Sequence, residues 1–276
     1  MKVWVNGGLR DVEDARVSVL DHGLTVGDGV FETAKAEHGR AFALTLHLER
    51  LTRSARGLGL PDPDHEEVRR ACAEVLAANP VERGRLRITY TGGLSPLGSD
   101  RGTDGPTLVV AVGASAERPD TTAAITVPWV RNERGALTGL KTTSYAENVV
   151  ALARAAERGA SEALFANTVG QLCEGTGSNV FVVVDGELLT PPVSSGCLAG
   201  ITRALTVHWT GATETDLPFD VLERADEVFL TSSLRDVQAV DRVDGRTLPG
   251  APGPVTTKAM RIFAERAEAD PDPRLS

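Results

Sequence analysis

Short turn sequences set between apolar segments place the strongest constraint on the fold of this chain. Asn6-Gly7 separates VWV from LRDV, His38-Gly39 lies within VFETAKAEHGRAFAL, and Asp185-Gly186 follows NVFVVV. Such dipeptides favour tight hairpins, because Gly and Asn tolerate the positive φ that the turns require. We therefore expect antiparallel β-hairpins in both halves of the chain.

Two helices should interrupt the strands of the first half. The segment 46–60 shows helical apolar spacing and ends in glycines, and the segment 65–80 is stopped by Pro80. At 276 residues the chain can form two cores. The polar stretch around SAERPDTT is the natural division between them. We predict a small N-terminal α+β domain at 1–114, an interdomain linker at 115–121 and a large C-terminal domain at 122–276.

Composition narrows the class of partner. The net charge is −9 and no basic run is present, which argues against nucleic acid or an anionic membrane. No apolar segment approaches the ~20 residues that span a bilayer, and the N-terminus lacks a signal segment, so we expect a cytoplasmic protein that binds a small molecule. The three cysteines are too scattered for a disulfide framework, and no histidine pair has the spacing of a metal site.

Lys141 is unusual in a chain that uses arginine for nearly all of its positive charge. Lysine occurs only at positions 2, 35, 141 and 258. A lysine can lose its proton and act as a nucleophile or base, which an arginine cannot do. An ordinary solvated lysine is the alternative, and this argument alone leaves both possibilities open.

A helix should begin near Tyr145, directly after Lys141 and three hydroxylated residues. Arg154, Glu157 and Arg158 would form its polar face. The apolar face would consist of Val149, Val150, Leu152, Ala153 and Ala156.

Four further features carry chemical groups. Glu174 begins EGTGSNVF, whose glycines allow the backbone to approach a ligand, and one carboxylate there could hold a protonated nitrogen. Gly200-Ile201-Thr202 precedes a helix, whose free N–H groups would accept a phosphate. Arg50 lies in HLERL, and Thr231-Ser232-Ser233 ends the strand EVFL. Singly, each has a structural explanation: a loop, a helix cap, a surface arginine and a polar strand end.

Together these segments resemble the class IV aminotransferases, the fold type IV pyridoxal phosphate enzymes. The resemblance rests on HLERL, GLK with the hydroxylated step to Tyr145, EGTGSNVF, TPP followed by GITR, and FLTSS, and it covers nearly the whole chain. It implies an α+β, D-amino acid aminotransferase-like fold of two domains. The smaller is an N-terminal α/β sandwich, and the larger C-terminal domain has mostly antiparallel strands.

The resemblance also implies a role for each residue. Lys141 corresponds to the lysine that forms a Schiff base with pyridoxal 5'-phosphate and then moves the proton at the reacting carbon. Glu174 corresponds to the carboxylate that keeps the pyridinium nitrogen protonated, and Tyr145 to a residue near the phenolic oxygen. The phosphate would be held by the Arg50 side chain, the N–H groups of Ile201 and Thr202, and the hydroxyls of Ser232 and Ser233.

The reaction is less constrained than the cofactor. Phe31 and RITYTGG replace the tyrosine and the Arg-x-His pair of well-known D-amino acid aminotransferases, and FETAK replaces the FEGIR of branched-chain enzymes. The pattern GDGVFET with K-x-x-S-Y favours 4-amino-4-deoxychorismate lyase, which releases 4-aminobenzoate and pyruvate in folate biosynthesis. The alternative is an aminotransferase acting on D-amino acids, branched-chain amino acids or (R)-amines with a 2-oxo acid acceptor. A non-catalytic pyridoxal phosphate-binding protein is a more distant alternative.

The substrate and subunit contacts follow from the same resemblance. Phe31 should line the substrate pocket, and an arginine should meet the substrate carboxylate, with Arg87, Arg101 and Arg235 as the candidates. The resemblance implies a homodimer in which the partner's N-terminal domain covers the pocket. Apolar residues of the N-terminal sheet support that expectation, because two helices would cover it only partly.

Overall fold

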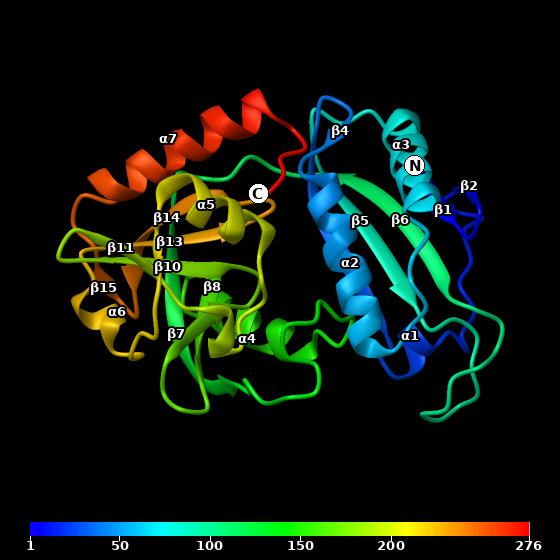
Figure 1. Ribbon diagram of the computed structural model, residues 1–276, viewed down its shortest axis with the longest axis horizontal. Coiled ribbons are helices and arrows are strands. Elements are labelled where there is room, and N and C mark those ends of the chain that lie inside the picture. The colour runs from blue at the N-terminus through cyan, green and yellow to red at the C-terminus, as the bar shows by residue number, and fades with distance from the viewer. Residues whose placement is uncertain (276) are drawn as a thin grey trace. The chain divides into compact units, whose positions relative to one another are not determined.

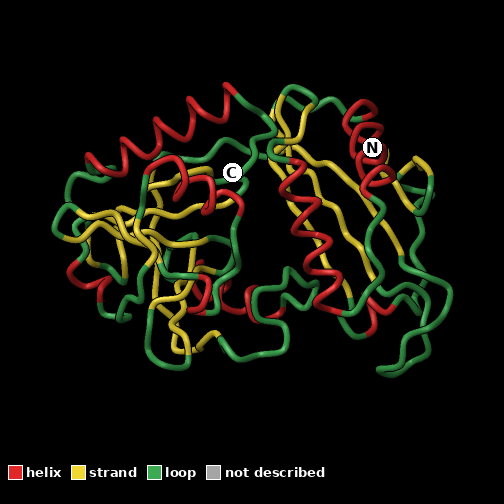
Figure 2. The backbone as a smooth tube through the Cα atoms, viewed as in Figure 1, coloured by secondary structure: helices red, strands yellow, loops and turns green. Residues whose placement is uncertain are grey.

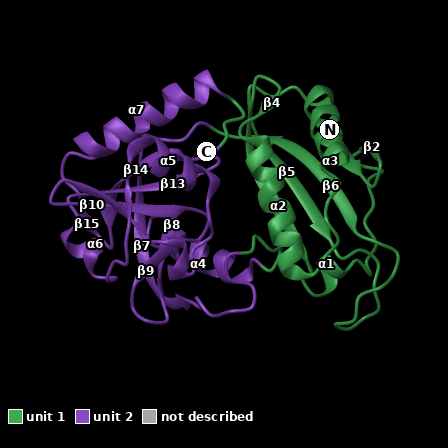
Figure 3. Cartoon of the chain, viewed as in Figure 1, with its two compact units in different colours: residues 1–116, 140–144, 271–274 green, residues 117–139, 145–270, 275–276 purple. Residues whose placement is uncertain are grey.

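The computed structural model describes residues 1–275 and divides into two compact units, coloured separately in Figure 3. The first unit comprises Met1–Ala116, Leu140–Ser144 and Pro271–Arg274. The second comprises Glu117–Gly139, Tyr145–Asp270 and the end of the chain. The chain therefore returns to the first unit twice, whereas the sequence predicted one crossing at 115–121 and placed Lys141 in the C-terminal domain.

Hydrogen bonds hold both returning segments in the first unit. The N–H of Phe31 donates to the carbonyl of Lys141 at 2.9 Å. The N–H and hydroxyl of Thr45 donate to the carboxylate of Asp272 at 2.8 and 2.6 Å. Asp272 thus caps a helix to which it is remote in sequence, and patterns of local residues give no sign of such a cap.

The first unit contains a six-stranded antiparallel sheet with the strand order β2-β1-β6-β5-β3-β4 (Figure 1). Asn6 and Gly7 adopt φ values of 40° and 83° in the turn between β1 and β2. The strands are β1 Lys2–Val5, β2 Gly8–Asp11, β3 Gly29–Glu37, β4 Arg40–Ala41, β5 Arg83–Thr91 and β6 Thr107–Ala114.

Helices cover one face of this sheet. They are α2 Leu44–Leu58 and α3 His65–Ala78, and α2 runs along the strands in Figure 2. The short helix α1 His22–Thr25 precedes β3 in the chain. Leu48 and Val75 of the helices join Leu86 and Ile88 of β5 in one buried core. Since successive strand residues face opposite sides, Phe31 belongs to the other face, with Thr33, Arg87 and Thr89 beside it in register.

The second unit contains a nine-stranded mixed sheet in which β12-β11-β10-β13-β14-β7-β8-β9 are adjacent in that order and β15 pairs with β14. Most pairs are antiparallel, as predicted, but β7 is parallel to both of its neighbours and β11 is parallel to β12. The strands are β7 Thr121–Arg131, β8 Glu162–Asn167, β9 Leu172–Gly175, β10 Asn179–Val184, β11 Glu187–Thr190, β12 Thr213–Glu214, β13 Glu227–Ser232, β14 Asp236–Val243 and β15 Arg246–Thr247.

The helices of the second unit are α4 Ala146–Glu157, the 3-10 helix η1 Val193–Ser195, α5 Ile201–Thr210, α6 Val221–Arg224 and α7 Pro254–Ala269. The predicted apolar face of α4 is wrong. Val149 and Val150 are 63% and 55% exposed, and α4 instead packs through Ala151 and Ala155 against β7 and β8. Ala151 and Ala155 are small enough for this close packing, and the larger Val149 and Val150 face outward. Across residues 1–275, no helix is both long enough and apolar enough to cross a membrane.

Candidate active site

Backbone hydrogen bonds fix Lys141 against β3 and α2. Besides its carbonyl, which accepts from Phe31, its N–H donates to the hydroxyl of Ser54 at 3.1 Å. The next residue, Thr142, pairs with Val30 in an isolated β-bridge. Lys141 therefore lies in an ordered segment, and the reading of it as an ordinary solvated lysine loses support.

The side chain of Lys141 lies beside an aromatic ring that a second cation also contacts. Its Nζ is 4.5 Å from the centroid of the Phe31 ring, and the guanidinium carbon of Arg87 is 3.4 Å from the same centroid. The Nε of Arg87 also donates to Thr89 at 3.3 Å. Phe31 thus groups an amine nucleophile with a guanidinium that can receive an anionic substrate.

Arg50 belongs to a buried polar cluster on α2. Its Nε and Nη2 donate to the two carboxylate oxygens of Glu32 at 2.8 and 2.7 Å, and the Nδ1 of His47 contacts the same carboxylate at 2.6 Å. Burial alone would raise the pKa of Glu32, but the charge and hydrogen bonds of Arg50, with the bond from His47, lower it to about 2. Arg50 is therefore held in one orientation by a charged partner, and it is not the surface arginine of the alternative reading.

Glu174 lies on β9 with both carboxylate oxygens engaged. Oε1 accepts from the Nε of Arg131 at 3.1 Å, and Oε2 accepts from the N–H of Leu198 at 2.9 Å. Arg131 also contacts Glu147 and Asn148, and its guanidinium lies 4.0 Å from the ring centroid of Phe165. These contacts fix the position and direction of the carboxylate.

Tyr145 borders the glycine-containing loop that follows Glu174. Its hydroxyl donates to the carbonyl of Thr176 at 3.2 Å. Burial, and next the charge of Glu174, raise the pKa of Tyr145, so its hydroxyl stays protonated near neutral pH. The tyrosine can donate a hydrogen bond at this loop.

The N-terminus of α5 has a geometry that suits an anion. Within residues 1–275 no side chain caps it: Gly200 occupies the N-cap position, and a Cβ on Gly200 would lie 1.9 Å from the Oδ1 of Asn179. Asn179 pairs in register with Thr231 on β13, whose Oγ1 is buried without a hydrogen-bond partner in residues 1–275. The amides of Ile201 and Thr202 therefore begin a helix beside the end of β13, where Ser232 is the last strand residue and Ser233 follows it.

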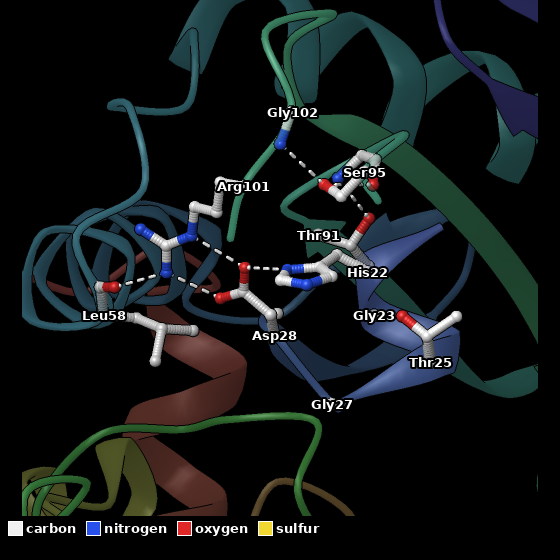
Figure 4. Close-up of polar contacts among 12 residues, drawn as sticks. His22, Gly23, Thr25, Gly27, Asp28, Leu58, Thr91, Ser95, Arg101 and Gly102 are labelled. Atoms are coloured by element: carbon white, nitrogen blue, oxygen red, sulfur yellow. Dashed lines mark hydrogen bonds and ion pairs between the residues drawn. The ribbon is translucent and has the colours of Figure 1, made fainter. Parts of the chain in front are cut away.

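Arg101 contacts acceptors of the protein itself (Figure 4). It donates to both oxygens of Asp28 at 2.7 and 2.6 Å and to the carbonyls of Leu58 and Gly59 at 2.6 Å each. Burial raises the pKa of Asp28, but the hydrogen bonds from Arg101 and His22 hold it below its ordinary value. Arg101 thus joins its loop to the start of β3.

Arg235 is likewise engaged. It contacts the side chain of Gln238, donates to the carbonyl of Ser161 at 2.9 Å, and lies 3.7 Å from a carboxylate oxygen of Glu162. Of the three candidate arginines, Arg87 alone lies beside the Phe31 ring that contacts Lys141. This position favours Arg87 as the group for a substrate carboxylate.

The three cysteines are buried, which keeps their thiols protonated. Burial raises the pKa of Cys173 and raises those of Cys72 and Cys197 to about 12 and about 11. All three thiols therefore remain protonated at neutral pH. Among residues 1–275, no three or more His, Cys, Asp or Glu side chains are grouped so that they could hold a metal ion.

Several residues around these groups were not predicted: Glu32, His47, Arg131, Glu162 and Asn179. Their partners lie far away in sequence; Arg131, for example, is 43 positions from Glu174. The available signal was weak but real. Glu32 is a charged residue directly after the apolar pair Val30-Phe31 in a strand, and Arg131 ends a strand.

Comparison with known proteins places the chain in a family. The model of the family "Amino-transferase class IV" matches residues 29–243. A putative branched-chain-amino-acid aminotransferase of Methanocaldococcus jannaschii is 34% identical over 96% of both chains. A bifunctional aminodeoxychorismate lyase / D-amino acid transaminase of Mycobacterium tuberculosis is 33% identical over 88% of this chain and 89% of the relative. The crystal structure of a branched-chain aminotransferase from Thermoproteus uzoniensis with norvaline has a TM-score of 0.89, with 30% identity over 96% of this chain and 94% of that one.

The chain belongs to the class IV aminotransferase family. It is a pyridoxal phosphate-dependent enzyme with the fold type IV architecture, as the resemblance implied.

The residues of the chain fit this cofactor. The uncapped α5 N-terminus, the hydroxyls at the end of β13 and the partnerless Oγ1 of Thr231 supply donors that suit a phosphate. Lys141 supplies an amine for an aldehyde, and Glu174 supplies an oriented carboxylate for a ring nitrogen.

Proposed function

We propose that this protein is an aminotransferase that moves an amino group between an α-amino acid and a 2-oxo acid. The observation that carries the proposal is the grouping of Lys141 and Arg87 on the Phe31 ring, 4.5 and 3.4 Å from its centroid. An amine and a guanidinium that contact the same ring suit a substrate whose reacting carbon also bears a carboxylate. The proposal therefore favours amino acids over simple amines.

Each residue has a defined part in the proposed reaction. Bound pyridoxal phosphate supplies an electron-accepting ring that stabilises negative charge at the substrate's α-carbon. The Nζ of Lys141 would hold the cofactor, and the same amine would carry the proton from and to that carbon. Glu174, held by Arg131 and the N–H of Leu198, keeps the ring nitrogen protonated.

The phosphate contacts are proposed for residues whose geometry suits an anion. The amides of Ile201 and Thr202 begin α5, and the hydroxyls belong to Ser232, which ends β13, and to Ser233, which follows it. Arg50 contributes a guanidinium oriented by Glu32. Tyr145 is proposed to lie near the phenolic oxygen, because its half-buried hydroxyl stays protonated and can donate.

The test is an assay of amino transfer with matched variants. Branched-chain amino acids and alanine, each as the D- and L-form, are incubated with 2-oxoglutarate or pyruvate. Arg87→Leu should raise the KM for the amino acid about tenfold or more, because an ionic hydrogen bond to the carboxylate is lost. Arg85→Leu, an exposed change on the same strand, should leave KM unchanged. No transfer with any pair, or equal KM values in both variants, would refute the proposal.

Aminodeoxychorismate lyase activity is the second candidate. The sequence pattern favoured it, and the M. tuberculosis relative carries that name jointly with a D-amino acid transaminase. The names of the M. jannaschii relative and of the T. uzoniensis structure support amino transfer instead. Release of pyruvate from aminodeoxychorismate without an amino acceptor would assign the lyase activity. Its absence, with transfer present, would leave the aminotransferase alone.

A further inference from the structure

Glu162 is a buried carboxylate to which the proposed reaction assigns no step. Its side chain is 2% exposed at the start of β8. Oε1 accepts from the N–H of Thr176 at 2.8 Å and from its hydroxyl, and Oε2 accepts from the hydroxyl of Ser178 at 2.7 Å. All of these donors belong to the loop that follows Glu174, so one carboxylate organises that loop.

The loop is shaped to fit this carboxylate. A Cβ on Gly175 would lie 2.8 Å from the carboxyl carbon of Glu162 and 2.6 Å from the hydroxyl of Ser178. Any larger residue at position 175 would push the loop away from Glu162. Gly175 thus permits the close approach, and Tyr145 contacts the same loop through the carbonyl of Thr176.

Arg235 connects Glu162 to a second segment. Its side chain is 9% exposed and its Nη2 lies 3.7 Å from Oε2 of Glu162. The backbone N–H of Arg235 donates to the hydroxyl of Ser232 at 3.2 Å. Arg235 therefore holds the turn after β13, which carries the two hydroxyls proposed for the phosphate.

A buried ion pair is weak evidence of stabilisation, because desolvation of two charges offsets much of their attraction. The Glu162–Arg235 ion pair matters here for geometry, because it joins two segments that carry the residues proposed to bind the cofactor. We propose that Glu162 and Arg235 are positioning residues that set the arrangement of the glycine-containing loop and the β13 turn for pyridoxal phosphate. This inference rests on the proposed function and gives Arg235 a part other than binding the substrate carboxylate.

The experiment measures cofactor binding separately from stability. The full-length protein and its variants are titrated with pyridoxal phosphate and with pyridoxal, which lacks the phosphate, and thermal unfolding is recorded alongside. Glu162→Gln should weaken pyridoxal phosphate binding by about tenfold, the typical effect of losing a partner that orients a ligand-binding group. Because the β13 turn loses its anchor, the preference for the phosphorylated compound should also fall.

Glu227→Gln is the matched control. The carboxylate of Glu227 accepts from the N–H groups of Val255 and Thr256 at 3.1 and 2.7 Å and lies at the opposite end of β13. This variant should lose stability without losing affinity or the preference for phosphate. Equal affinity losses in the two variants would overturn the inference.

Milder variants keep the test decisive if Glu162→Gln does not fold. Arg235→Lys retains the charge and should bind the cofactor better than Arg235→Met does, and Ser178→Ala removes one bond to Glu162. Wild-type affinity in both Arg235→Met and Ser178→Ala would overturn the inference. Failure of the wild-type protein to bind pyridoxal phosphate would instead refute the proposed function.

Discussion

At the scale of single residues, Lys141 lies beside the Phe31 ring that Arg87 also contacts. Lys2 and Lys35 pair with Asp11 and Glu37 at 2.8 and 3.4 Å. Lys141→Arg should preserve the fold and abolish turnover, because a guanidinium does not deprotonate at neutral pH. Circular dichroism and the transfer assay check this, with Lys258→Arg as the control. Substantial activity in Lys141→Arg would contradict the assignment.

Glu174 should affect the rate more than the affinity for the cofactor. Glu174→Gln keeps an oxygen for the N–H of Leu198 but loses the charge that holds the ring nitrogen protonated. The rate should fall by the equivalent of ~3 kcal/mol, the cost of one preorganised charge contact. Single-turnover rates and cofactor titrations measure the two effects. Equal losses in rate and affinity would show that the carboxylate serves mainly to bind.

Glu32 should make the free energy of unfolding depend on pH in the acid range. Its pKa falls from 4.5 to about 2 beside Arg50, so its contribution is present above about pH 4.5 and is lost as the pH falls towards 2. The contribution is on the order of 3 kcal/mol of unfolding free energy. Urea unfolding between pH 6 and pH 3 should show a steeper decline for the wild type than for Glu32→Gln. Parallel declines would contradict the prediction.

At the scale of elements, His22 ties the loop 94–105 to the start of β3. Its ring nitrogens lie 2.8 Å from the carboxylate of Asp28 and 2.9 Å from the carbonyl of Gly98. Both partners are acceptors, so only the protonated ring satisfies both. The bonds to Asp28 and Gly98 raise the pKa of His22 above its ordinary value of 6.5. Their contribution to stability is therefore complete below pH 6.5 and is lost as the pH rises through the raised pKa.

The loop should open as the pH rises. We expect trypsin to cleave after Arg101 faster above that pKa than below it, relative to the general pH dependence of the protease on an unstructured peptide. The His22→Gln variant, whose new side chain does not titrate, should be cleaved quickly at all pH values. A wild type whose relative cleavage rate does not change with pH would refute this prediction.

Sequence reasoning predicted the hairpins and the main helices, but not the contacts that orient the proposed site residues. The hairpins at Asn6-Gly7 and Asp185-Gly186 were predictable because turn chemistry is local. The α4 face was not, since Ala151 and Ala155 pack inward while Val149 faces outward. Contacts such as Glu162 with Ser178 depend on how strands pair, and no local pattern encodes that.

At the scale of the whole molecule, the chain presents apolar side chains to solvent. Val19, Leu24 and Leu97 are 77%, 69% and 79% exposed, on two segments joined by the hydrogen bond from His22 N–H to Gly93 O at 2.8 Å. Such an exposed apolar surface is most often buried against a second copy of the same chain. Sedimentation at micromolar concentration should show a dimer, which Leu97→Glu weakens and Val193→Glu does not. A fully active monomer would contradict this.

The attachment of the cofactor tests the central claim most directly. The purified protein should be yellow, and borohydride should remove that absorbance by reducing the bond between the cofactor and a lysine. Peptide mapping by mass spectrometry then locates the modified residue. The account predicts one pyridoxyl group, on Lys141. A label on Lys2, Lys35 or Lys258, or no label on a protein that retains full activity, would contradict it.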